Sequence, residues 1–192
     1  ILLCVNASNI EKDWNWIISK IDGFDCRATN QSDNYSLLAV QGPMVQEYFE
    51  KLGLLTKDED FSYYSVKQKQ FIGTDIILAR TGYTGEDGFE VFCSNHDSAL
   101  MLWDKLLSMG ATACGLVARD VLRLEVCFPL YGNELINELT PFDSALRWTV
   151  KLYKKDFIGK DALANYESKY RLVKLSLDKG IPREKYPVLD SS

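Results

Sequence analysis

Apolar residues alternate with polar ones over several short stretches of this chain and recur at helical spacing over others. A period of two is typical of a strand with one buried face, and spacings of three and four are typical of a helix. Strands are predicted at residues 1–5, 35–40, 63–71, 75–80, 89–93, 148–152 and 171–177. Helices are predicted at about 9–21, 43–52, 97–109, 116–126 and 160–166, with a short one starting at Thr140 and Pro141.

These elements follow one another irregularly, and Gly73 and Thr74 mark a hairpin turn between two of the strands. No repeated strand-helix-strand unit of the parallel-sheet type is present in the pattern. The predicted class is therefore α+β, with antiparallel sheet and flanking helices. The amphipathic alternation of residues 171–177 indicates that a further domain begins near there.

Composition and charge argue against two classes of function, nucleic-acid binding and membrane insertion. The 192 residues are 46 % hydrophobic and carry a net charge of −5, with lysines scattered along the chain. Binding of nucleic acid needs a concentrated positive surface, so we expect no nucleic-acid partner. No apolar run reaches the roughly 18–20 residues that cross a bilayer, so we also expect no membrane span.

Cysteine and histidine usage argues against a metal site. The five cysteines form no CxxC pair, and His96 is the single histidine. Cysteines in apolar runs behave as small buried hydrophobes, which indicates reduced thiols in a reducing compartment. No cysteine has the histidine partner that would activate it as a nucleophile.

Residues 80–90 combine three glycines with a tyrosine and three carboxylates, and they are the strongest candidates for a functional site. The run contains Gly82, Gly85 and Gly88 within seven residues, and glycines so placed allow positive φ angles or close approach of the backbone to another group. Glu90 follows on an apolar strand, where a carboxylate needs partners. A plain hairpin turn with its acidic residues in water is the alternative interpretation.

The glycine-rich run is one of several ordered blocks that together resemble the aminomethyltransferase, or T-protein, family of the glycine cleavage system. The resemblance covers essentially the whole chain. The other blocks are Val5–Asp13, Val40-Gln41-Gly42-Pro43, Gly115–Glu125, Leu130-Tyr131-Gly132-Asn133-Glu134, Thr140-Pro141-Phe142, Arg147-Trp148-Thr149-Val150 and Asp156-Phe157-Ile158-Gly159.

The resemblance implies a folate-binding aminomethyltransferase fold over residues 1–165 and the beginning of a C-terminal β-barrel domain over residues 166–192. It implies an enzyme that moves the methylene of an aminomethyl-lipoyl carrier, the H-protein, to tetrahydrofolate and releases ammonia. We expect the chain to be a piece of a longer protein, inactive by itself, from a bacterial cytoplasm or a mitochondrial matrix.

Four residues are implied to bind the folate. Glu90 accepts hydrogen bonds from the pterin edge in a bidentate fork, Tyr83 lines the site, and Asn6 lies near the pterin. Arg119 either holds a folate carboxylate or steadies Glu90. For Glu90 the structural alternative is a salt bridge to a neighbouring strand.

The sequence departs from the family pattern at Val117 and at Val126-Cys127, where smaller residues are usual. The aspartate that the family uses in catalysis falls upstream of Ile1, so no catalytic residue is assigned within the chain. The rival functions are a folate-dependent demethylase, the folate domain of a sarcosine or dimethylglycine oxidising enzyme, and a folate-binding protein without transferase activity.

Overall fold

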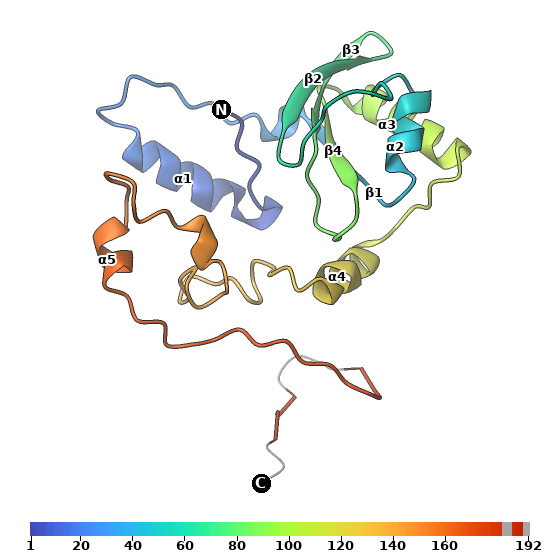
Figure 1. The fold of residues 1–192 in the computed structure, drawn as a ribbon. Coiled ribbons are helices and arrows are strands. Elements are labelled where there is room, and N and C mark those ends of the chain that lie inside the picture. The colour runs from blue at the N-terminus through green and yellow to red at the C-terminus, as the bar shows by residue number, and fades with distance from the viewer. Residues whose placement is uncertain (182–185, 190–192) are drawn as a thin grey trace. The chain divides into compact units, whose positions relative to one another are not determined.

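A computed structural model describes residues 1–181 and 186–189 of the chain (Figure 1). The chain divides into two compact units, Ile1–Phe128 and Pro129–Ser192. The first contains a four-stranded sheet with helices, and the second consists mainly of turns with one short helix. The domain boundary expected near residue 165 stays a prediction.

One antiparallel sheet organises the first unit, with its strands in the order β1-β4-β3-β2. The strands are β1 (Ser36–Gln41), β2 (Val66–Phe71), β3 (Thr74–Ala79) and β4 (Gly88–Cys93). The helices are α1 (Ile10–Lys20), α2 (Val45–Lys51), α3 (His96–Ser108) and α4 (Leu116–Glu125), and the second unit holds α5 (Lys160–Ala164). The predicted α+β class with antiparallel sheet and flanking helices is confirmed.

The core lies on one face of this sheet. Along β4, the alternate residues Phe89, Val91 and Cys93 are fully buried, as their period of two requires. Phe49 of α2 stacks on Phe89 with 5.1 Å between the ring centroids, and Leu102 of α3 joins the same cluster. The core thus fixes which way every second residue of β4 points.

The opposite face of the sheet carries Glu90 and Phe92 of β4. In the register of the sheet, Glu90 pairs with Ala39 on β1 and with Ala79 on β3, and Phe92 pairs with Leu37. Glu90 and Phe92 are half-buried, so this face is much less covered than the core face. Because both neighbours of Glu90 are alanines, its carboxylate is flanked by small side chains.

In the second unit, the helix predicted to start at Thr140 is absent, and the chain forms a turn that Asp143 holds. Its buried carboxylate accepts hydrogen bonds from the backbone N–H and hydroxyl of Thr140, and from the hydroxyls of Tyr166 and Ser168. Burial alone raises the pKa of an aspartate, but these hydrogen bonds hold the pKa of Asp143 below its ordinary value. A side chain that captures the first turn in this way competes with helix formation.

Three predicted strands are absent from the described residues. Residues 1–5 and 171–177 have no strand partner there, and a strand needs one for its hydrogen bonds. At 148–152 a 3-10 turn, Arg147–Thr149, takes the place of a strand, because the Thr149 hydroxyl donates to the carbonyl of Leu146 and holds the backbone locally. No helix in the described part of the chain combines the length and apolarity that a membrane crossing requires.

The hairpin turn between β2 and β3 lies one residue earlier than predicted. Phe71 pairs with Thr74, so Ile72 and Gly73 form the turn, with φ angles of +48° and +75°. Two positive φ angles define a type I′ turn, whose usual residues are Asn and Gly. An isoleucine with positive φ is strained, because its branched Cβ crowds the backbone.

Replacing Ile72 by asparagine should therefore stabilise the protein by about 0.5–1 kcal/mol. The side chain is more than half exposed, so little packing is lost. Urea unfolding curves of Ile72→Asn and of the control Ile72→Val, which keeps the branched Cβ, give the comparison. An Asn variant no more stable than the Val variant would show that the turn is not strained.

Candidate functional site

The glycine-rich loop at residues 81–87 joins β3 to β4, and an ion pair closes its base. Arg80 Nη2 lies 2.9 Å and 3.1 Å from the two carboxylate oxygens of Asp87, and Arg80 Nε lies 3.2 Å from one of them. Arg80 Nη1 also donates to the carbonyl of Phe61. Charge-assisted, forked contacts of this kind fix geometry as well as energy. The two ends of the loop are therefore held together.

Glu90 lies just beyond the loop on the less covered face of the sheet. The hydroxyl of Thr81 donates to Glu90 Oε2 at 2.5 Å, so the first loop residue orients the carboxylate. Within the described residues, no arginine, lysine or histidine forms an ion pair with Glu90. The alternative in which Glu90 makes a salt bridge to a neighbouring strand is not seen, and the carboxylate keeps further acceptor capacity.

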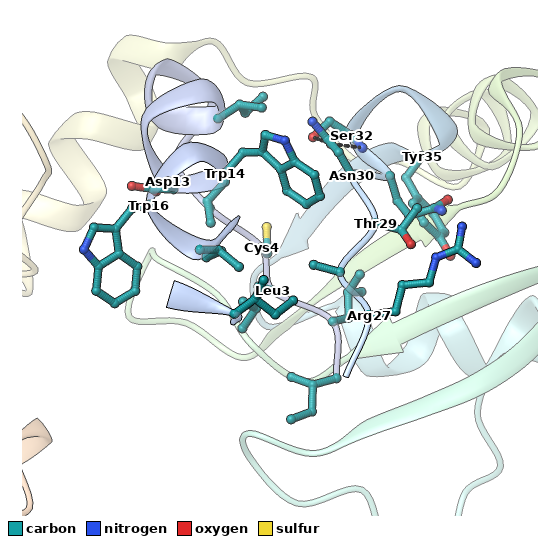
Figure 2. A pocket seen from close by; sticks show the side chains of 18 of the residues that line it. Leu3, Cys4, Asp13, Trp14, Trp16, Arg27, Thr29, Asn30, Ser32 and Tyr35 are labelled. Atoms are coloured by element: carbon teal, nitrogen blue, oxygen red, sulfur yellow. Dashed lines mark hydrogen bonds between the residues drawn. The ribbon is translucent and has the colours of Figure 1, made fainter. Parts of the chain in front are cut away.

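A hollow of about 820 Å³ lies over the same face of the sheet (Figure 2). Its walls come from residues 1–5, from α1, from residues 24–32 and from Leu37 and Phe92 of the sheet. Figure 2 shows the indole of Trp14 directed toward Cys4. The lining is mostly apolar and aromatic, and its volume falls within the roughly 300–1,000 Å³ of small-molecule sites.

The charge of Glu90 reaches this hollow. Phe92, two residues along β4, forms part of its wall, whereas Glu90 does not line it directly. Partial burial and the nearby Glu90 carboxylate raise the pKa of the Cys4 thiol, which does line it. Glu90 therefore lies at the margin of the apolar hollow.

Tyr83 and Arg119 come together at a second point of the loop. The guanidinium of Arg119 lies 5.4 Å from the centroid of the Tyr83 ring, and Phe128 stacks on the same ring with 5.8 Å between the centroids. Arg119 forms no ion pair with Glu90 among the described residues. Its contact is instead a cation–π interaction, and its exposed side chain leaves the guanidinium edge accessible.

The carbonyl of Phe128 is itself held by Arg123 of α4. Arg123 is 2 % exposed, and it donates to Asp120 Oδ1 at 2.7 Å and to the carbonyl of Phe128 at 3.1 Å. The Tyr83 hydroxyl points to the same carbonyl at 3.5 Å. The buried arginine therefore supports the aromatic pair from α4 without facing the site.

Asn6 is placed less decisively than the other three candidates. It precedes the 3-10 turn Ala7–Asn9, its side chain caps no helix, and it is exposed. Its neighbours Val5 and Ala7 line the hollow, but Asn6 does not. The structure thus brings Tyr83 to Arg119, sets Glu90 at the other end of the same loop, and leaves Asn6 beside the hollow.

Sequence reasoning missed the aromatic wall of the hollow. The helical spacing of apolar residues predicts a helix at about 9–21 but gives Trp14 no part in a site, and α1 buries none of its residues. Its stripe residues Ile10, Trp14 and Ile17 line the hollow instead. The available signal was the pair of tryptophans, Trp14 and Trp16, in a helix of eleven residues.

Each of the three glycines within residues 80–90 lies against a side chain. An ideal Cβ on Gly85 would lie 2.2 Å from Cγ1 of Val126, and Gly85 also has a φ of +76°. On Gly82 and Gly88 it would collide with the amide of Gln41. The close approach expected from the glycine spacing is therefore present at all three positions, and Val126, a departure from the family pattern, packs directly against the loop.

Known proteins are similar to this chain in fold and in sequence. The crystal structure of glycine cleavage system aminomethyltransferase T from Bartonella henselae superposes with a TM-score of 0.66 at 32 % identity, over 76 % of this chain and 38 % of that one. Proteins named aminomethyltransferase are 42 % identical in Staphylococcus saprophyticus and 45 % identical in Deinococcus deserti, over 98 % and 99 % of this chain. The match covers 53 % and 52 % of those relatives, so the chain spans about half their length.

A family model described as the GCVT N-terminal domain matches residues 1–154. With the relatives above, this match shows that the chain belongs to the GCVT family, the aminomethyltransferases of the glycine cleavage system. The resemblance drawn from the ordered sequence blocks is confirmed. The roles of the four candidate residues stay predictions.

Replacing Gly85 by alanine should destabilise the protein by about 1–3 kcal/mol, from the positive φ and from the collision with Val126. In the double variant Gly85→Ala, Val126→Ala the collision is removed while the backbone strain remains. Thermal unfolding of the two single variants and the double variant forms a mutant cycle. Strictly additive effects would contradict the contact between Gly85 and Val126.

Proposed function

We propose that this protein transfers the methylene of an aminomethyl-lipoyl carrier to tetrahydrofolate and releases ammonia, within the glycine cleavage system. The observation that carries the proposal is Glu90. Its carboxylate has no cationic partner among the described residues, lies between Ala39 and Ala79, and adjoins an apolar hollow of small-molecule size. The family membership supports the same reaction class.

The residues fit a reduced pterin. A pterin presents an exocyclic amine beside a ring N–H, and one carboxylate can accept both hydrogen bonds side by side. Thr81 holds one oxygen of Glu90, so the carboxylate is oriented before a ligand arrives. Apolar walls that include Phe92 and Trp14 suit the flat ring, and the low polarity there strengthens the hydrogen bonds of a charged group.

Arg119 suits the other end of the folate. Its guanidinium is exposed and held over Tyr83, which orients it without using up its donors. A guanidinium is the side chain best suited to a carboxylate, because its donors form a planar fork. We therefore assign Arg119 to a folate carboxylate, and Tyr83 to the support of Arg119 and to the wall of the site.

Tetrahydrofolate supplies the nucleophilic amine that takes up the methylene. The protein's contribution is to hold that amine beside the aminomethyl group of the lipoyl arm, since orientation alone removes a large part of the barrier. Two of the cysteines are poorly suited to act as a nucleophile, because Cys93 is buried in the core and the pKa of Cys4 is raised. We infer that the 192 residues alone do not catalyse the reaction, because they span only about half the length of the related aminomethyltransferases.

The full-length protein allows a direct test. It is incubated with tetrahydrofolate and an H-protein loaded with the aminomethyl group, and ammonia and 5,10-methylenetetrahydrofolate are measured. Both products should form in equal amounts. Demethylation of sarcosine or dimethylglycine with folate, or folate binding with neither reaction, would overturn the proposal in favour of the corresponding rival function.

Glu90→Ala in the full-length protein should weaken tetrahydrofolate binding by about 2–5 kcal/mol, the range for truncating one partner of a buried charged hydrogen bond. Calorimetric titration measures the dissociation constant. Glu86→Gln is the matched control, because Glu86 is an exposed carboxylate on the same loop. An unchanged dissociation constant for Glu90→Ala would remove Glu90 from the site.

A further inference from the structure

Gln41, the last residue of β1, reaches across the base of the glycine-rich loop. Its Nε2 donates to the carbonyl of Thr81 at 3.1 Å and to the carbonyl of Phe89 at 3.2 Å. Its Oε1 accepts a hydrogen bond from the hydroxyl of Thr84 at 3.3 Å. A single side-chain amide therefore contacts the entry, the middle and the exit of the loop, across 40 to 48 residues of sequence.

Two loop glycines are shaped to this amide. An ideal Cβ on Gly82 would lie 1.9 Å from Gln41 Oε1, and one on Gly88 would lie 2.4 Å from Gln41 Cδ. Neither glycine has a positive φ, unlike Gly85. Backbone conformation therefore does not require glycine at these two positions, and the space taken by Gln41 does.

The chemistry of the contacts is specific to glutamine. The two loop carbonyls need a donor and the Thr84 hydroxyl is placed to donate, so the side chain must offer both functions. Glutamate has the same shape but no donor, and would set a negative charge against two carbonyl oxygens. Asparagine has both functions but is shorter by one methylene.

We propose that Gln41 is a positioning residue, which clamps residues 81–88 so that Tyr83 and Glu90 keep the orientation in which they bind their ligand. Thr81, whose carbonyl Gln41 holds, is the residue whose hydroxyl orients Glu90. Phe89, whose carbonyl it also holds, directly precedes Glu90. The effect on ligand binding rests on the proposed function, whereas the clamp itself does not.

Gln41→Glu in the full-length protein tests the clamp and its effect on binding separately. The first readout is the rate of cleavage after the exposed Glu86 by a glutamate-specific protease, followed by mass spectrometry. The second is the dissociation constant of tetrahydrofolate. The matched control is Gln68→Glu, the same chemical change at an exposed position of β2 in the same sheet.

We expect Gln41→Glu to speed cleavage after Glu86 about tenfold or more and to weaken tetrahydrofolate binding about 10–100-fold, as is typical of residues that orient ligand-contacting groups. Gln68→Glu should change neither. Cleavage at the wild-type rate would overturn the clamp. Faster cleavage with unchanged affinity would overturn the positioning role and leave folate binding intact. A wild-type protein that binds no tetrahydrofolate would refute the proposed function, and cleavage would still decide the clamp.

A mutant cycle with Gly82→Ala separates this role from a general loss of stability. Gly82→Ala alone should weaken tetrahydrofolate binding, because the new methyl displaces the Gln41 amide. In the Gln41→Ala background the amide is gone, so Gly82→Ala should change the affinity less than twofold further. Effects that multiply in full would show that the two residues act independently, against the proposal.

Discussion

The ion pair between Arg80 and Asp87 is the contact on which the arrangement of the site depends. Arg80 directly follows β3 and Asp87 directly precedes β4, so their pairing brings the two ends of the loop together where the strands part. Without it, a loop that contains Gly82 and Gly85 would have large conformational freedom to lose on binding. With this ion pair, the loop leaves and rejoins the sheet at fixed points, so the sheet determines where Tyr83 and Glu90 lie.

The register of β4 connects the core to the site. Phe89 and Val91 are fully buried against α2 and α3, so Glu90 between them must point to the other face. A slip of one residue would bury the carboxylate in an apolar core without a partner, at a large cost. The stability of the core therefore decides which face of the sheet carries Glu90, and the hydrogen bond from Thr81 then orients its carboxylate on that face.

The spacing of apolar residues predicted those helices and strands that depend on contacts within their own segment. The helices predicted at about 9–21 and 116–126 and the strand predicted at 89–93 follow from spacing within the segment, and the structure has them at 10–20, 116–125 and 88–93. The strand expected at 148–152 failed, since short-range hydrogen bonds there outcompete an extended backbone. The hydrogen bond from Gln41 to the carbonyl of Phe89 joins residues that are 48 apart in the sequence. The spacing of residues within one segment cannot predict such a contact.

The hollow and the carboxylate are complementary in physical terms. A carboxylate alone in water gains little from hydrogen bonds to a ligand, because water competes for the same acceptors. An apolar hollow alone holds a flat ring without selecting its orientation. Glu90 lies two residues from Phe92, which with Trp14 forms part of the wall of the hollow. Apolar walls thus strengthen the hydrogen bonds that Glu90 would make to a ligand, and those hydrogen bonds select which edge of the ring faces Glu90.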